Sequence, residues 1–129
     1  MDIAPFLMFT GQAEEALGHY VSLFEGSRIE QITRWGPGGP APEGQVMMAT
    51  VVLAGQKVMA SDSPPVHAFT FTPSLSLFVA CGSEEEFKRV LAGLSEGGET
   101  LMPAGDYGFS RRYAWLNDRF GVSWQVNLP

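Results

Sequence analysis

The sequence has little of what metal centres and covalent cross-links require. It contains one cysteine, Cys81, which cannot form a disulfide within the chain, and two histidines, His19 and His67. Structural zinc and many iron sites are built from imidazole and thiolate groups. The composition therefore excludes a disulfide-stabilised scaffold and a zinc finger.

Basic residues and long apolar runs are also scarce. Lys and Arg number 8 against 14 Asp and Glu, which gives a formal net charge of −6 at pH 7. Such a chain is not generally attracted to nucleic acid or anionic membranes. The longest apolar run, residues 46–54, is far shorter than the roughly 20 residues that span a bilayer, and the first residues lack the pattern of a signal peptide. We therefore expect a cytoplasmic protein whose partners include neither nucleic acid nor a membrane.

What remains is the composition of an ordinary globular protein. The 129 residues are 45% hydrophobic and 17% charged. This balance is far from that of disordered chains. The length suits one compact domain or two very small halves.

The first half of the chain predicts a strand, a helix and three strands. The apolar run of residues 3–9 predicts the first strand. Apolar residues at helical spacing follow it, and Gly26 stands where that helix should stop. Residues 27–35, 46–53 and 57–61 then predict three further strands. The glycine- and proline-rich stretch at 36–42 is expected to be a loop.

The same pattern restarts in the second half. Residues 74–81 predict a strand, and Ser83 with Glu86 forms the capping box of a second helix. A shift of about 70 residues superposes the two helical stripes, which indicates an internal repeat. Residues 109–116 and 122–128 predict two later strands. We therefore expect an α+β protein made of two βαβββ modules, residues 1–68 and 69–129.

Several segments resemble a known family. They are residues 5–11 and 13–17, then Tyr20 and Phe24, and the block at 116–125 with the sequence LNDRFGVSWQ. On these segments the chain resembles the vicinal oxygen chelate superfamily of glyoxalases, bleomycin resistance proteins and extradiol dioxygenases. Within it, the match is to the PhnB-like group, also called 3-demethylubiquinone 3-methyltransferase-like. The resemblance implies that the two modules form a half-barrel cleft and that the protein is a homodimer whose modules are paired or swapped between protomers.

The resemblance also implies where a metal would be held. Members of the superfamily usually bind a divalent metal through His and Glu side chains, and the metal acts as a Lewis acid. Three of the corresponding positions hold Pro5, Ser74 and Gln125, none of them a good ligand. The fourth position aligns loosely with Met59, Ser61 or Asp62. We therefore expect a cleft without a metal and a protein without a cofactor.

Three functions stay open at this point. The leading hypothesis is a small-molecule-binding protein, or an uncharacterised enzyme, that holds an apolar or aromatic metabolite in a metal-poor cleft. The residues predicted to line the cleft are Phe6, Met8, Met59, Ser61, His67, Tyr107, Trp115 and Gln125. The alternative is a divalent-metal-dependent lyase, isomerase or dioxygenase with Asp62, His67 and Gln125 as ligands. A catalytically silent dimerisation module is the third possibility.

Several individual residues have two interpretations. His67 is either an acid–base or ligand contact or an exposed loop residue. The stretch at 105–112, with Arg111 and Arg112, either closes over an anionic ligand or is a solvated loop. The aromatic residues of the last third either stack on a planar ligand or fill the core.

Two chemistries are not supported by the residues. Cys81 ends a predicted strand and is expected to behave as a small buried hydrophobe, since no neighbour in sequence would lower its pKa. A typical S-adenosylmethionine-dependent methyltransferase has a glycine-rich turn between its first strand and helix. The glycines at 36–39 lie between two predicted strands instead, so the residues do not support methyl transfer.

Overall fold

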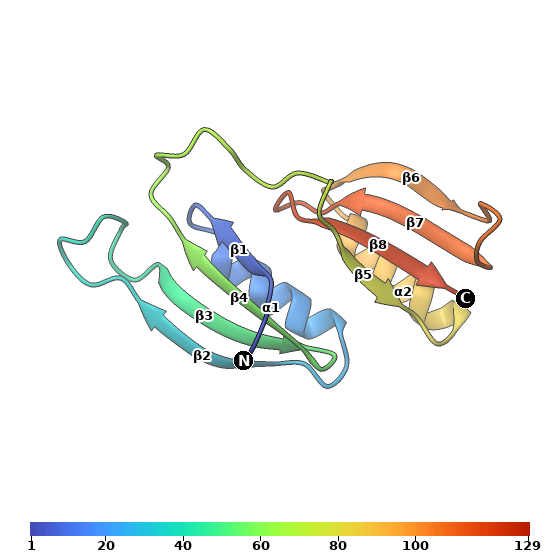
Figure 1. The fold of residues 1–129 in the computed structure, drawn as a ribbon, viewed down its shortest axis with the longest axis horizontal. Helices are drawn as coiled ribbons and strands as arrows, with labels where there is room; N and C mark the ends of the chain where they lie inside the picture. Colours follow the sequence, from blue (N-terminus) through green and yellow to red (C-terminus); the bar gives the residue numbers. More distant parts are fainter. The chain divides into compact units, whose positions relative to one another are not determined.

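The computed structural model describes all residues from 1 to 129. The chain divides into two compact units, unit 1 (Met1–Thr70) and unit 2 (Phe71–Pro129). Each unit contains a strand, a helix and three further strands in that order (Figure 1). The predicted α+β fold with two βαβββ modules is confirmed. No helix is long and apolar enough to cross a membrane.

Unit 1 is a four-stranded sheet with one helix. The strand order is β1-β4-β3-β2, with β1 parallel to β4 and the other pairs antiparallel. Its elements are β1 (Phe6–Phe9), α1 (Ala13–Leu23), β2 (Arg28–Arg34), β3 (Val46–Leu53) and β4 (Gln56–Asp62).

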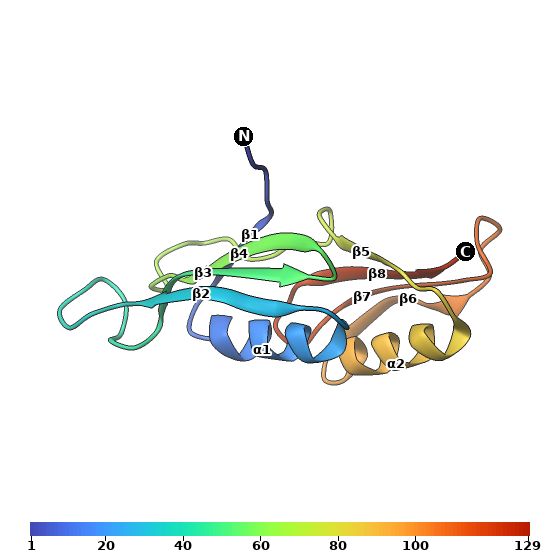
Figure 2. The ribbon, with the colours of Figure 1, turned by 90° about the horizontal axis from the view of Figure 1, so that it is seen from below.

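Helix α1 covers one face of this sheet (Figure 2). Its buried side chains include Leu17 and Tyr20, as the helical spacing predicts. They belong to the same core as the strand residues Val51 and Val58, which are also almost fully buried. In β2, Ile29 and Ile32 are three positions apart and do not follow strict alternation, and a register shift against β3 between Ile29 and Gln31 accounts for this. Such bulges change which face a side chain occupies.

Unit 2 repeats this arrangement. The strand order is β5-β8-β7-β6, with β5 parallel to β8. Its elements are β5 (Leu77–Ala80), α2 (Glu84–Ser95), β6 (Glu99–Gly105), β7 (Arg112–Asn117) and β8 (Ser123–Leu128).

The hydrogen bonds at the start of α2 differ in one respect from the predicted capping box. The Ser83 hydroxyl accepts a hydrogen bond from the backbone N–H of Glu86 at 3.1 Å. The Glu86 carboxylate, however, accepts from the N–H of Gly82 at 2.9 Å rather than from that of Ser83. The acidic residue therefore satisfies a donor one residue earlier than the motif predicts. The buried stripe of α2 consists of Phe87, Val90 and Leu94.

Several strand predictions need correction. The sequence did not predict the strand β6. This strand contains Pro103, and its pairing with β7 has two register shifts, so its residues do not show a regular alternation. Residues 109–111 were predicted to be strand but form a loop, in which Phe109 is 64% exposed. The predicted strands 3–9 and 74–81 begin later, at Phe6 and Leu77.

Candidate functional site

Each helix leaves the opposite face of its sheet uncovered, and we call these surfaces the open faces. Residues that point to the helix alternate with residues that point away from it. Burial and strand register together identify the residues that point away from the helix. The open face of unit 1 consists of Phe6, Met8, Met48, Thr50, Val52, Lys57, Met59 and Ser61. The open face of unit 2 consists of Phe78, Ala80, Tyr113, Trp115, Asn117, Ser123, Gln125 and Asn127.

The register of unit 1 brings four of the predicted site residues together. In the parallel pair of β1 and β4, Phe6 lies beside Met59 and Met8 lies beside Ser61. Phe6 is 49% exposed, and the other three are partly exposed. Flexible methionine side chains suit a surface that adapts to apolar ligands.

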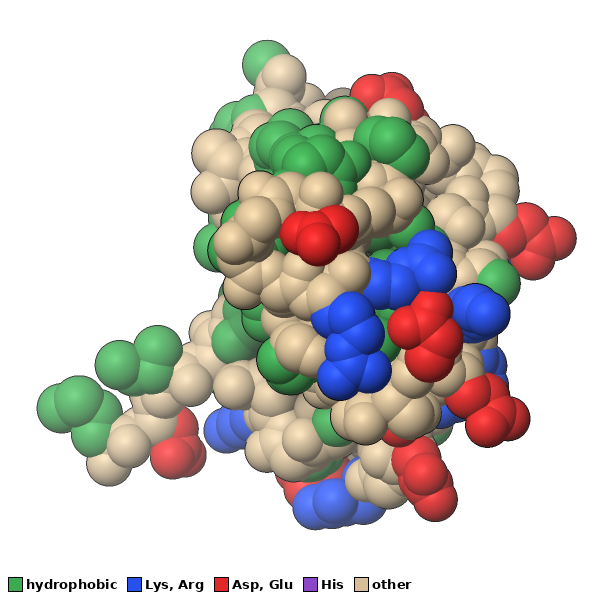
Figure 3. Space-filling model, turned by 90° about the vertical axis from the view of Figure 1, so that its right-hand side faces the viewer, with side chains coloured by type: hydrophobic (Ala, Val, Ile, Leu, Met, Phe, Trp, Pro, Cys, Tyr) green, Lys and Arg blue, Asp and Glu red, His purple; other side chains and the backbone are tan.

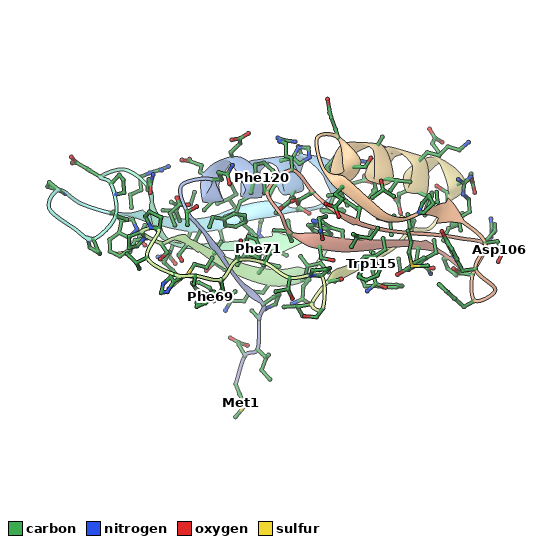
Figure 4. All side chains as sticks on the ribbon, turned by 90° about the horizontal axis from the view of Figure 1, so that it is seen from above. Met1, Phe69, Phe71, Asp106, Trp115 and Phe120 are labelled. Carbon is green, nitrogen blue, oxygen red and sulfur yellow. The ribbon has the colours of Figure 1, made fainter.

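The open face of unit 2 centres on Trp115. Trp115 on β7 lies directly opposite Gln125 on β8. Figure 4 shows Trp115 on the side of the sheet away from α2. Its indole N–H donates to the Ser123 hydroxyl at 3.0 Å, and that hydroxyl is 2.8 Å from the hydroxyl of Ser76. These contacts hold the indole in place while leaving it partly exposed.

Hydrogen bonds also orient the polar side chains around the indole. The Tyr113 hydroxyl donates to Oε1 of Gln125 at 2.7 Å. The Ser110 hydroxyl donates to Oδ1 of Asn127 at 2.6 Å. Oδ1 of Asn117 is buried and has no hydrogen-bond partner. The face therefore combines the aromatic rings of Phe78, Tyr113 and Trp115 with polar groups that hydrogen bonds orient.

Two further aromatic rings gather beside Tyr113. The Phe109 ring lies edge-on to Tyr113 at 4.9 Å between centroids, and the Tyr107 ring does so at 5.9 Å. Tyr107 and Phe109 stack on each other at 6.4 Å. Burial, and to a lesser degree Tyr107, raises the pKa of Tyr113, so its hydroxyl stays protonated at neutral pH.

Arg112 is not available to a ligand on this face. Its guanidinium lies 2.7 Å from the Glu84 carboxylate and 5.2 Å from the centre of the Phe87 ring, and both partners belong to α2. In the view of Figure 3, basic side chains lie next to acidic ones. The suggestion that this arginine pairs with an anionic ligand is therefore not supported.

His67 and Cys81 belong to neither set of open-face residues. His67 is exposed in the connector after β4, and its ring stacks on Phe69 at 4.9 Å. Cys81 is 3% exposed. Burial first, and then the charge of Glu86, raises the pKa of its thiol. A thiol of this kind is a poor nucleophile.

The residues present do not fit a divalent metal centre. No group of three or more His, Cys, Asp or Glu side chains is placed to hold an ion. The Asp62 carboxylate accepts the backbone N–H groups of Gly11, Ala13 and Val46 at 2.8–3.0 Å. Oε1 of Gln125 already accepts from Tyr113. Two of the three ligands in the alternative hypothesis are thus engaged elsewhere.

Comparison with known proteins now gives the family. A sequence profile for 3-demethylubiquinone-9 3-methyltransferase matches residues 1–127. The chain belongs to this family. The structure is similar to a protein from Bacillus cereus described as a putative 3-demethylubiquinone-9 3-methyltransferase, PhnB protein, with 50% identity, a TM-score of 0.96 and full coverage of both chains.

More distant relatives share the fold. The protein PA1353 from Pseudomonas aeruginosa is 30% identical, with a TM-score of 0.85 over 99% of this chain and 97% of its own. The fosfomycin resistance protein FosX from Listeria monocytogenes is 11% identical, with a TM-score of 0.60 over 100% of this chain and 93% of its own. These results confirm the PhnB-like, glyoxalase-like fold that the sequence resemblance implied.

Some open-face residues were missed by sequence reasoning. Phe78 lies beside Gln125 in the β5–β8 pair and is 58% exposed. Ser76 and Ser123 form the hydroxyl pair that receives the indole N–H. Residues on the same face of a strand are two positions apart, so Ser123 was accessible from Gln125 by alternation alone. Nothing in the sequence singles out Ser76.

Proposed function

We propose that this protein binds a small apolar or aromatic metabolite on its open faces, through protein groups without a metal. The residues assigned to binding are Phe6, Met8, Met59 and Ser61 in unit 1 and Tyr107, Trp115 and Gln125 in unit 2. The observation that carries the proposal is the partly exposed Trp115 indole, held by Ser123 and surrounded by oriented polar groups. An aromatic surface with a few fixed polar groups is typical of small-molecule sites.

His67 is part of the same prediction, and its contact with a ligand remains a prediction. We also propose that the protein is a homodimer. Apolar side chains on both open faces are exposed in the single chain, Phe6 by 49% and Phe78 by 58%. Exposed apolar surface of this kind marks sites of interaction.

The proposal does not include the chemistry in the family's name. The loop from β1 to α1 has one glycine, Gly11, in place of a glycine-rich turn. A Cβ added there would lie 3.1 Å from the Gln45 side chain, and the φ of Gly11 is +118°. The glycine is therefore explained by backbone geometry, and no methyl transfer is derived from these residues.

Binding of 2-ethylnaphthalene, a neutral aromatic probe, tests the proposal. Equilibrium dialysis of the full chain should show saturable binding. The Trp115→Ala variant should weaken that binding about tenfold, because a stacked aromatic contact and its buried area are lost. The control is Ile3→Ala, which truncates an apolar residue that is 88% exposed before β1. Absence of saturable binding, or equal losses in the two variants, contradicts the proposal.

A further inference from the structure

One hydrogen bond determines which polar atom stands free beside the Trp115 indole. The Tyr113 hydroxyl donates to Oε1 of Gln125 at 2.7 Å. A phenol that instead accepted an N–H from the amide would leave its own hydrogen without an acceptor, which is costly for a side chain that is 7% exposed. The raised pKa of Tyr113 keeps that hydrogen in place.

The amide nitrogen of Gln125 is consequently turned outward. With the carbonyl oxygen engaged, the side chain has two N–H donors left. The hydrogen bonds of the structure include none from this nitrogen, and the residue is partly exposed. The neighbouring indole N–H of Trp115 is already used by Ser123. The free polar group that Gln125 offers beside the ring is therefore a hydrogen-bond donor.

The strands that carry and flank this donor have no charged side chain on the open face. None of the open-face residues of β5, β7 and β8 carries a formal charge, and the charge that the register places at the edge of this face is the acidic Glu99 of β6, opposite Asn117. Arg112, which begins β7, is paired with Glu84 on the helix side. An ionised ligand group would lose hydration on this face without gaining a counter-charge, which is unfavourable.

We propose that Gln125 is a specificity-determining residue that selects neutral, planar aromatic ligands bearing a hydrogen-bond acceptor, such as an aryl ketone. Tyr113 is the positioning residue that keeps the amide N–H groups outward. The ligand ring lies against Trp115 and its acceptor oxygen receives an N–H of Gln125. This inference rests on the proposed function, since it concerns the same open face.

Two probes of matched shape test the inference. The probe 2-acetonaphthone carries a carbonyl acceptor, and 2-ethylnaphthalene has the same ring system without one. The full chain should bind the ketone roughly five- to tenfold more tightly in equilibrium dialysis, the effect of about one net hydrogen bond. In Gln125→Met, which keeps the side-chain length but removes the N–H donors, this ratio should fall to about one.

The positioning role of Tyr113 has a separate readout. Tyr113→Phe keeps the ring but frees the amide to rotate. The ratio of the two affinities should then fall to about two or less, with little change for 2-ethylnaphthalene. A purely structural role would weaken both probes alike and leave the ratio unchanged. The matched control is Gln56→Met, which makes the same change at an exposed glutamine of β4, and its ratio should equal that of the unmodified chain.

The outcomes separate the two levels of the proposal. Equal affinities of the unmodified chain for the two probes, or an unchanged ratio in Gln125→Met, would overturn the role of Gln125. An unchanged ratio in Tyr113→Phe alone would overturn the role of Tyr113. If neither probe binds, the proposed function itself is wrong.

Discussion

At the scale of single residues, each unit contains one buried aspartate that accepts hydrogen bonds from neighbouring segments of the same unit. Asp62 is 2% exposed and accepts three backbone N–H groups from the loop before α1 and the start of β3. Asp118 is 4% exposed and accepts from Phe120, Val122 and the indole of Trp124. A buried carboxylate is tolerated when such donors satisfy it. These side chains are therefore structural, although Asp62 was a plausible metal ligand by sequence.

Asp62→Asn should destabilise the protein by about 2–3 kcal/mol. The amide nitrogen cannot accept a hydrogen bond, so a buried backbone N–H loses its partner. Urea denaturation should show a lower midpoint with an unchanged slope. Asp106→Asn is the control, since Asp106 lies on an exposed loop and accepts from Gly108. Similar midpoints for the two variants would argue against the structural role of Asp62.

Cys81 should react slowly with a thiol reagent in the native protein. It is 3% exposed, and burial raises the pKa of its thiol, so less thiolate is present at pH 8 than in a free cysteine. We expect labelling by Ellman's reagent to be at least about tenfold faster in urea than in native buffer. A native rate equal to the denatured rate would show that this strand end opens readily.

At the scale of elements, the approach of β6 to β7 depends on a missing side chain. A Cβ added to Gly98, just before β6, would lie only 3.0 Å from Cα of Asp118 and closer still to the carbonyl oxygen of Asn117. Both contacts are with backbone, which cannot turn aside. The absence of a side chain at Gly98 thus allows β6 to begin directly against the end of β7.

Gly98→Ala should therefore lower the free energy of unfolding by about 1–3 kcal/mol. Gly18→Ala provides the opposite case. Gly18 lies on the exposed side of α1, where an added Cβ meets nothing within 4 Å. This change should stabilise the protein by about 0.5–1 kcal/mol, because alanine favours helix. Thermal unfolding of both variants measures the contrast, and a stabilised Gly98→Ala variant would contradict the steric argument.

At the scale of the whole molecule, the chain is a repeat of one βαβββ unit, and each unit has a core between its helix and its sheet. Small units bury a limited fraction of their surface. In both units the side chains of each strand point alternately to the two sides of the sheet, so one face is buried against the helix and the other is open. The two open faces differ in chemistry: that of unit 1 carries methionines and that of unit 2 carries aromatic and amide groups.

The proposed homodimer predicts a mass of twice 14.0 kDa. Sedimentation equilibrium at micromolar concentration should give that value, because exposed apolar residues such as Phe6 and Phe78 favour association. A mass of one chain at all concentrations would rule out the dimer.

Part of the candidate site was predictable because strands alternate. Trp115 and Gln125 were expected to share a surface, and the β7–β8 register places them directly opposite each other. The Tyr113–Gln125 hydrogen bond was not predictable, since the two residues are diagonal across the pair and meet only in this register. The pairing of Arg112 with Glu84 was not predictable either, because the two residues lie 28 positions apart on a strand and a helix.

The sequence by itself determined the repeat, the order of elements in unit 1 and the faces that the helices bury; in unit 2 it left β6 unlocated. These properties depend on the spacing of apolar residues along the chain, and that spacing repeats in every turn of a helix and every second residue of a strand. Only the tertiary structure decided that Asp62 is occupied by backbone donors, that Arg112 pairs with α2, and that Gln125 accepts the Tyr113 hydroxyl. Such outcomes depend on which atoms distant segments bring within about 3 Å, and hydrogen bonds are sensitive to that distance.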